Sequence, residues 1–225
     1  MLLAVLLLAL LCALHSSLAC QTGFDSDQLI AQADMQCLKT NGYTYFIGQI
    51  YKGDGTVNQN GVNSIKNARA AGYTGLVDAY VTPCVNKTKY SCKSATQQAA
   101  DAINNLLRTS GAHIGRVWLQ VVAGEWPNDP TANRKFMEDF AAQVIKQKPQ
   151  FGVQTNQNDF VSVGGSGYTG MQQYQLWWNQ LNNGIADYIG YVGFSGWAIP
   201  SMHQYNRNGK LNANCNPTAN QDWFF

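Results

Sequence analysis

Two acidic residues stand where the chain could place chemical groups at the ends of strands. Asp25 follows a short β-type segment, and Asp78 lies within the apolar run 76–81. Two positioned carboxyl groups can protonate a leaving oxygen and stabilise a developing positive charge, which is the chemistry that cleaves a glycosidic bond. The next apolar run, 117–122, contains no acid where a further carboxylate would be expected. The sequence therefore places acidic residues at or near the ends of two strands but provides none in the strand 117–122.

Alternating strand-like and helix-like segments would position these residues. The expected strands are 23–25, 43–51, 75–81, 114–122 and 151–155, and the expected helices are 26–40, 62–71, 94–107 and 130–144. Ser26 is predicted to cap the first helix, and Ser94 with Gln97 forms a capping-box pattern. This order predicts an α/β fold, a parallel sheet or barrel with helices outside, and ligands bind such folds at the C-terminal ends of the strands. After Val161 the pattern loosens and assigns no regular element.

The first 19 residues predict export. They contain no charged side chain, and an apolar run from Met1 to Leu14 is followed by small residues up to Ala19. We interpret residues 1–19 as a secretory signal peptide and predict a secreted protein. The run is too short for a membrane span, and a lipoprotein acylated at Cys20 is the alternative. Cutting after Ala19 leaves 225 − 19 = 206 residues, which suits one domain over 20–225.

Composition limits the partners of the chain. The formal net charge is +2 and the basic residues are scattered, so nothing resembles the basic stripe of a nucleic-acid binder. Abundant Asn, Gln, Gly, Tyr and Trp suit a neutral, hydroxyl-rich ligand, although an ordinary secreted surface has the same composition. His113 and His203 stand alone, so we expect no metal site and no cofactor. We expect a monomer.

The cysteines also favour an exported protein. Cys84 and Cys92 flank a short loop and are expected to pair, and Cys37 could then pair with Cys215. That pairing leaves Cys20 over. Asn86-Lys87-Thr88, inside the Cys84–Cys92 loop, is an acceptor sequence for N-glycosylation at Asn86.

Several motifs carry a family resemblance. The chain resembles the nematode and amoeba branch of the glycoside hydrolase family 25 lysozymes, which shows a Val-Asp-x-Tyr-x-x-Pro-Cys pattern matched here by residues 77–84. Supporting segments in the expected order are Ala70–Tyr73, Val117–Leu119, Leu176-Trp177, Gly196-Trp197 and Gln204-Tyr205. The resemblance implies an irregular, flattened (β/α) TIM-like barrel. It also implies a secreted muramidase that acts on bacterial peptidoglycan in defence or digestion.

The acids of the family carry over only in part. Asp25 matches the aspartate that family members have at the end of the first strand. Asp78 matches the aspartate in the Val-Asp-x-Tyr-x-x-Pro-Cys pattern of the nematode and amoeba branch. The family's Asp-x-Glu, whose glutamate donates the proton, falls on Gln120 and Val122, and a late aspartate falls on Asn220. Neither glutamine nor valine can protonate a leaving oxygen.

Glu125 could replace the missing acid, because a carboxyl group beside an indole such as Trp126 can become a proton donor. The simpler interpretation is a solvated loop glutamate. Asp25 and Asp78 also have a simpler interpretation, as acceptors of hydrogen bonds from neighbouring backbone.

Aromatic and amide side chains could contact sugar rings or hydroxyls, although each aromatic residue could equally fill the core. The candidates are Tyr80, Trp118, Gln120, Trp126, Trp177 and Gln204, with Gln49 and Asn156 as further amides. Three functions fit these residues. The first is a secreted lysozyme-like protein that recognises bacterial cell-wall glycan with weak or lost hydrolysis. The second is an active muramidase that uses Asp25, Asp78 and a relocated acid, Glu125. The third is a secreted signalling or interaction protein without catalysis.

Overall fold

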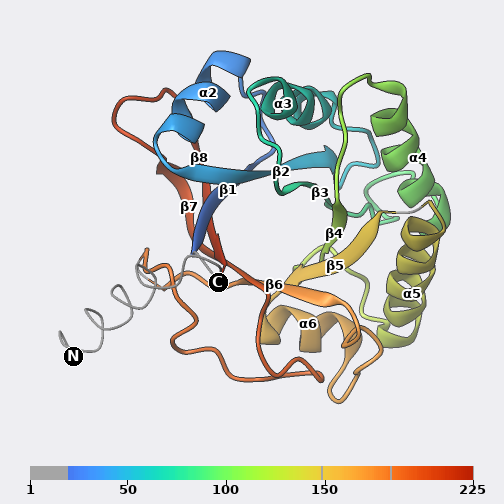
Figure 1. Cartoon of the computed structure of the whole chain (residues 1–225). Coiled ribbons are helices and arrows are strands. Elements are labelled where there is room, and N and C mark those ends of the chain that lie inside the picture. Colours follow the sequence, from blue (N-terminus) through green and yellow to red (C-terminus); the bar gives the residue numbers. More distant parts are fainter. Residues whose placement is uncertain (1–19, 148, 183, 225) are drawn as a thin grey trace.

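Eight strands form a closed barrel in which neighbours in sequence are neighbours in space (Figure 1). They are Gln21–Ser26 (β1), Tyr43–Tyr51 (β2), Val77–Val81 (β3), Arg116–Gln120 (β4), Gln150–Thr155 (β5), Gln175–Asn179 (β6), Met202–Lys210 (β7) and Thr218–Phe224 (β8). This computed structural model describes residues 20–147, 149–182 and 184–224. The predicted signal peptide, residues 1–19, lies outside the described residues.

Helices cover the outside of the barrel (Figure 1). They are Gln32–Thr40 (α2), Gln59–Ala70 (α3), Ala95–Arg108 (α4), Pro130–Lys146 (α5) and Gln157–Gly164 (α6). Strands β1 to β7 run parallel, and β8 is antiparallel to both β7 and β1. The connection 211–217 is too short for a crossover, so β8 can only return as a hairpin. The predicted α/β, TIM-like barrel is confirmed.

Alternate residues of each strand pack on opposite sides of the barrel wall. One apolar set lies between the strands and the helices and includes Phe46, Val77 and Leu119. The other set fills the barrel interior and consists of Tyr45, Ile47, Tyr80, Trp118, Trp177 and Met202. The interior is therefore a packed core rather than a pore.

Two glycines make room for large rings in that interior. A Cβ atom added to Gly23 would lie 2.4 Å from the ring of Tyr45, and one added to Gly152 would lie 2.4 Å from the ring of Trp118. Each glycine lies beside its aromatic residue on the neighbouring strand, as in the pairs Gly23–Tyr45 and Trp118–Gly152. The barrel thus combines small and large side chains at facing positions.

Both predicted disulfides are confirmed. Cys84 pairs with Cys92, and Cys37 on α2 pairs with Cys215 in the connection between β7 and β8. The second bond joins residues 178 positions apart and so ties the two ends of the domain together. Cys20 takes part in neither of these two bonds.

Element boundaries differ from the sequence predictions in two helices. Helix α2 begins at Gln32 rather than Ser26, because the Ser26 hydroxyl accepts the Gln28 N–H in a turn before the helix. Helix α3 begins at Gln59, capped by the Asn58 side chain, three residues before the predicted start.

The sequence pattern did not predict α6, β6, β7 and β8. Strands β7 and β8 contain the polar stretches Asn206–Lys210 and Asn220–Asp222, which lack the alternation of apolar residues that identifies a strand. Within the described ranges, no helix is long and apolar enough to cross a membrane.

Candidate functional site

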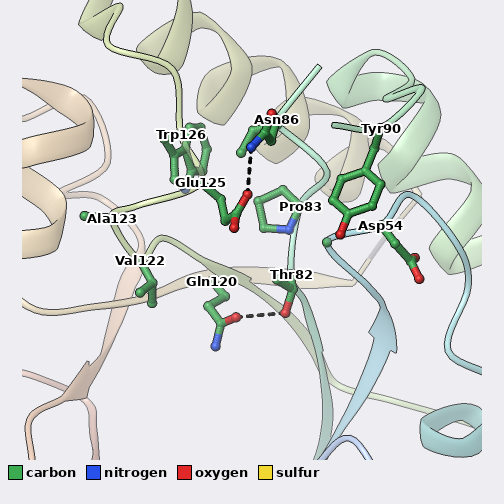
Figure 2. A pocket seen from close by; sticks show the side chains of 12 residues that line it. Asp54, Thr82, Pro83, Asn86, Tyr90, Gln120, Val122, Ala123, Glu125 and Trp126 are labelled. Carbon is green, nitrogen blue, oxygen red and sulfur yellow. Dashed lines mark hydrogen bonds between the residues drawn. The ribbon is translucent and has the colours of Figure 1, made fainter. Parts of the chain in front are cut away.

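A cavity of about 380 Å³ opens at the C-terminal ends of β3 and β4 (Figure 2). Its wall comes from the end of β2, from the residues that follow β3 and β4, and from the Cys84–Cys92 loop. We call it the mouth cavity; it is lined by Gly53, Asp54, Thr82, Pro83, Val85, Asn86, Tyr90, Gln120, Val122, Ala123, Glu125 and Trp126. Its place is the one at which parallel barrels bind their ligands.

Four of the predicted site residues meet in the mouth cavity: Asn86, Gln120, Glu125 and Trp126. Glu125 is exposed, and its Oε2 accepts a hydrogen bond from Asn86 Nδ2 at 2.9 Å (Figure 2). The half-buried Trp126 ring packs edge-on against Phe136 of α5, with ring centroids 5.5 Å apart. The cavity therefore has two carboxylates on its wall, from Asp54 and Glu125, together with Gln120 and Val122, the two positions at which the family resemblance implies Asp-x-Glu.

Neutral side chains form a continuous hydrogen-bonded chain across the ends of four neighbouring strands. Asn58 Nδ2 donates to Gln49 Oε1 at 2.8 Å, and Gln49 Nε2 donates to Thr82 Oγ1 at 2.9 Å. The Thr82 hydroxyl donates to Gln120 Oε1 at 2.8 Å, as Figure 2 shows, and Gln120 Nε2 donates to Gln154 Oε1 at 2.8 Å. We call these five residues the amide chain. All its bonds run in one direction, so each fixes the orientation of the next group. No member can deliver a proton to a glycosidic oxygen.

Two buried carboxyl groups lie side by side beneath the barrel mouth. Asp25 on β1 and Asp222 on β8 are 1% and 0% exposed, and the ionisation of each carboxyl group depends on the other. Asp25 also accepts from Gln204 Nε2 at 2.6 Å and from Asn220 Nδ2 at 2.9 Å. Asp222 Oδ1 accepts from Trp177 Nε1 at 3.0 Å, whereas its Oδ2 has no hydrogen-bond partner among the described residues. Two buried carboxyl groups that interact cannot both ionise without a large cost, so one of them retains a proton more readily.

The surroundings assign that proton to Asp222. Burial raises the pKa of the Asp25 carboxyl to about 6, although the amides of Asn220 and Gln204 stabilise its charged form. Burial, followed by the negative charge of Asp25, raises the pKa of Asp222 well above its usual range. Asp25 is the better solvated by hydrogen bonds, so it ionises first and Asp222 stays neutral. The protonated form is therefore favoured at Asp222 more strongly than at Asp25.

Asp78 lies at the opposite end of the barrel from the mouth cavity. It is the second residue of β3 and is 1% exposed. Its oxygens accept the Arg116 backbone N–H at 2.9 Å and Trp118 Nε1 at 3.0 Å, and the Arg116 guanidinium lies 3.8 Å away. Burial raises the pKa of Asp78, and Arg116 opposes that rise. The prediction that Asp78 reaches the ligand-binding end is therefore wrong, because the strand places it in an internal ion pair.

Four of the six predicted sugar contacts are buried in the barrel. Trp118 and Trp177 are 0% exposed, with ring centroids 5.7 Å apart, and Tyr80 packs edge-on against Trp177. Gln204 is buried and donates to Asp25. Side chains without exposed surface cannot stack on a sugar or bind its hydroxyls, so the expected contacts of these four are corrected to core and hydrogen-bonding roles.

A second cavity, of about 330 Å³, lies at the same end of the barrel, beyond β5 and β6. Its lining combines amide side chains with apolar ones and contains no charged residue: Asn156, Gln157, Asn158, Trp178, Gln180, Leu181, Asn182, Ile189, Gly190, Val192 and Phe194. Asn156 thus lies in a cavity at the mouth, as the sequence analysis expected for this amide.

Sequence reasoning missed Asp222, Asp54 and Tyr90. Asp222 is polar and lies in a strand that the pattern did not reveal, so its pairing with Asp25 had no local signal. Tyr90 reaches the mouth cavity because the Cys84–Cys92 bond folds the loop back over the ends of the strands. That disulfide was the signal that could have placed Tyr90 near the site.

The fold itself is that of solved glycan-cleaving enzymes. A muramidase from Trichobolus zukalii superimposes with a TM-score of 0.67 and 14% identity, covering 91% of this chain and 93% of that one. A family 25 glycosyl hydrolase from Bacillus anthracis superimposes with a TM-score of 0.66 and 14% identity, covering 94% and 91%. At this identity the similarity establishes the barrel architecture alone.

Sequence comparisons identify the family. The family model described as Lysozyme-like protein 1 matches residues 16–205. Lysozyme-like protein 5 of Caenorhabditis elegans is 31% identical over 84% of this chain and 85% of its own length. Probable GH family 25 lysozyme 4 of Dictyostelium discoideum is 31% identical over 97% of both chains. The chain belongs to the lysozyme-like proteins of the glycoside hydrolase family 25 type.

Proposed function

We propose that this protein is exported, binds bacterial cell-wall glycan at the barrel mouth, and hydrolyses it weakly or not at all. The observation that carries this proposal is the amide chain at the ends of β2 to β5. Gln120 uses both its oxygen and its nitrogen within that chain, and Val122 beside it has no polar atom. The position from which the family resemblance implies proton donation therefore holds no acid.

The two cavities at the mouth suit a neutral polymer. Both lie at the C-terminal ends of the strands, one beyond β3 and β4 and one beyond β5 and β6. Amide groups and aromatic or aliphatic surfaces line both, with the carboxylates of Asp54 and Glu125 added in the mouth cavity. Amides and apolar surfaces together bind hydroxyl groups and the apolar faces of sugar rings. A linear glycan could contact both cavities at once.

Co-sedimentation with insoluble peptidoglycan tests the binding, and loss of turbidity of a Gram-positive wall suspension tests the hydrolysis. We expect the purified protein to sediment with the wall material and to leave its turbidity unchanged from acid to neutral pH. Absence of sedimentation would contradict the proposal and favour an interaction protein that does not bind glycan. Clearing of the suspension would favour the active muramidase.

The active muramidase is the second candidate, because Glu125 places a carboxylate in the same cavity as Gln120 and Val122. A substitution of Glu125 by Gln separates the two candidates. If Glu125 donates the proton, Glu125→Gln lowers the clearing rate by about 10² to 10⁴.

Under our proposal any hydrolysis is weak and does not depend on Glu125, so wild type and Glu125→Gln should give the same turbidity traces. The matched control is Glu138→Gln on α5. Glu138 accepts a hydrogen bond from the Tyr168 hydroxyl at 2.9 Å, and the side-chain oxygen of glutamine can accept the same bond. A clearing activity that only the Glu125 substitution abolishes would establish the relocated acid.

A further inference from the structure

The side chain of Asn86 is held at the rim of the mouth cavity in one orientation. Its Oδ1 accepts the Thr88 hydroxyl at 2.7 Å and the Lys89 backbone N–H at 3.1 Å. These two bonds leave Nδ2 directed at Glu125 Oε2, 2.9 Å away (Figure 2). The amide nitrogen of Asn86 therefore faces the cavity.

The loop that carries Asn86 is anchored at both ends. The Cys84–Cys92 disulfide closes it, and Gln98 of α4 fixes its start. Gln98 Oε1 accepts the Cys84 N–H at 2.9 Å, while Gln98 Nε2 donates to the Cys84 carbonyl at 2.8 Å. Gln98 is fully buried, so this anchor is part of the core. A group attached to Asn86 would consequently stay at the cavity rim.

We propose that Asn86 carries an N-linked glycan that covers the mouth cavity and limits access of wall glycan to it. Asn86-Lys87-Thr88 meets the acceptor pattern, and no proline separates the asparagine from the threonine. The inference rests on the export and the glycan binding proposed above, and it adds a modification that regulates the same site.

The chemistry replaces one hydrogen of the amide. The bond between the anomeric carbon of a lipid-linked oligosaccharide and its diphosphate breaks, and a C–N bond forms to Asn86 Nδ2. The nitrogen loses one proton to the medium, and the diphosphate leaves with the bonding electron pair. Nδ2 retains its other hydrogen, so the hydrogen bond to Glu125 can persist in the modified protein.

An oligosaccharide on Asn86 is large enough to cover the mouth cavity. A cavity of about 380 Å³ is at the small end of the range for ligand pockets, which is roughly 300 to 1,000 Å³. A branched oligosaccharide is larger than that space, so it closes the opening without having to fill it. If the glycan leaves the cavity open one tenth of the time, the apparent Kd for wall glycan rises about tenfold.

The test compares the protein made in a eukaryotic secretory host with Thr88→Ala and Thr88→Ser variants. Alanine abolishes the acceptor sequence and leaves Asn86 in place, whereas serine keeps both the hydroxyl and the acceptor sequence. Mass spectrometry of the peptide that contains Asn86 is expected to show an oligosaccharide on wild type and Thr88→Ser and none on Thr88→Ala. An unmodified Asn86 in the secreted wild type would overturn the proposal.

Tryptophan quenching by acrylamide measures access to the cavity without any ligand. The chain has six tryptophans; Trp126 is half-buried in the cavity wall, whereas Trp118, Trp177, Trp178, Trp197 and Trp223 are at most 7% exposed. Trp126 is therefore the main quenchable ring. We expect stronger quenching of Thr88→Ala than of wild type or Thr88→Ser. Equal quenching of glycosylated and unglycosylated proteins would contradict the covering role.

Enzymatic trimming of the wild-type glycan to its first sugar gives the same comparison if Thr88→Ala does not fold, and it should increase the quenching of Trp126. Peptidoglycan sedimentation then separates this inference from the proposed function. Stronger quenching and about tenfold tighter sedimentation of Thr88→Ala support both. Stronger quenching without any sedimentation supports the covering glycan but contradicts the glycan-binding function.

Discussion

Replacement of Asp222 by asparagine is expected to stabilise the protein at pH 8 and to reduce the dependence of its stability on pH. In the wild type, burial and the negative charge of Asp25 raise the pKa of Asp222, which favours its protonated form inside the barrel. An asparagine has nearly the same shape, its amide can donate to Asp25, and its oxygen can accept from Trp177 as Asp222 does at 3.0 Å. The variant can therefore make the same hydrogen bonds, but its side chain does not ionise, so its folding takes up no proton at this position.

The sign follows from the direction of the pKa changes. Both carboxyl groups have folded-state pKa values above their ordinary value of 3.8, so the folded protein holds protons that the unfolded chain releases. The two carboxyl groups contribute fully to the free energy of unfolding below pH 3.8. The contribution of Asp25 is lost as the pH rises through about 6, and that of Asp222 is lost as the pH approaches its higher pKa. A rise from 3.8 to about 6, as for Asp25, corresponds to about 3 kcal/mol.

Urea unfolding at several pH values between 4 and 8 measures this effect. The difference in free energy of unfolding between Asp222→Asn and wild type should grow as the pH rises. Asp129→Asn is the matched control, because Asp129 caps α5 from the surface by accepting the Ala132 N–H at 3.0 Å and asparagine caps equally well. Parallel pH profiles for Asp222→Asn and wild type would show that Asp222 does not retain a proton in the folded protein.

The same pair marks the limit of sequence-based prediction for this protein. Asp25 was recognised as a strand-end acid, but its partner belongs to β8, whose polar residues gave no periodic signal. The two acids meet only because β8 returns antiparallel beside β1 and aligns Asn220 with Asp25. Register between strands almost 200 residues apart is a tertiary property, and no local pattern encodes it.

The first five strands and four of the helices could be predicted because apolar residues recur there at strand or helix spacing and capping residues mark the helix starts. The position of Asp78 could not be predicted, because the sequence of an apolar strand with one aspartate is the same whether that aspartate faces a ligand or an internal arginine. Trp118 and Trp177 pose the same problem, since aromatic rings suit a sugar cleft and a barrel core equally well. Only the packing of neighbouring strands assigns these side chains to the interior.

Substitution of Val122 by glutamate is expected to give the protein measurable muramidase activity. Val122 is partly exposed in the mouth cavity, so a carboxyl group there remains hydrated enough to be tolerated. The nearby Glu125 carboxylate would raise the pKa of the new acid by like-charge repulsion, which favours its protonated, donating form. A positioned general acid contributes about 10² to 10⁴ in rate, so the clearing of a wall suspension should increase by that order.

Val122→Gln is the matched control, because glutamine has the size and polarity of glutamate but no proton to donate. Both variants should sediment with peptidoglycan as the wild type does, and only Val122→Glu should clear the suspension, with a rate that falls as the pH rises through the pKa of the new acid. Clearing by both variants would mean that polarity rather than acidity was missing. If Val122→Glu binds the wall but clears nothing, the absent acid at this position does not account for the lost hydrolysis. The amide chain at Gln120, which fixes a neutral group where the second acid of the pair would stand, would then be the next position to change.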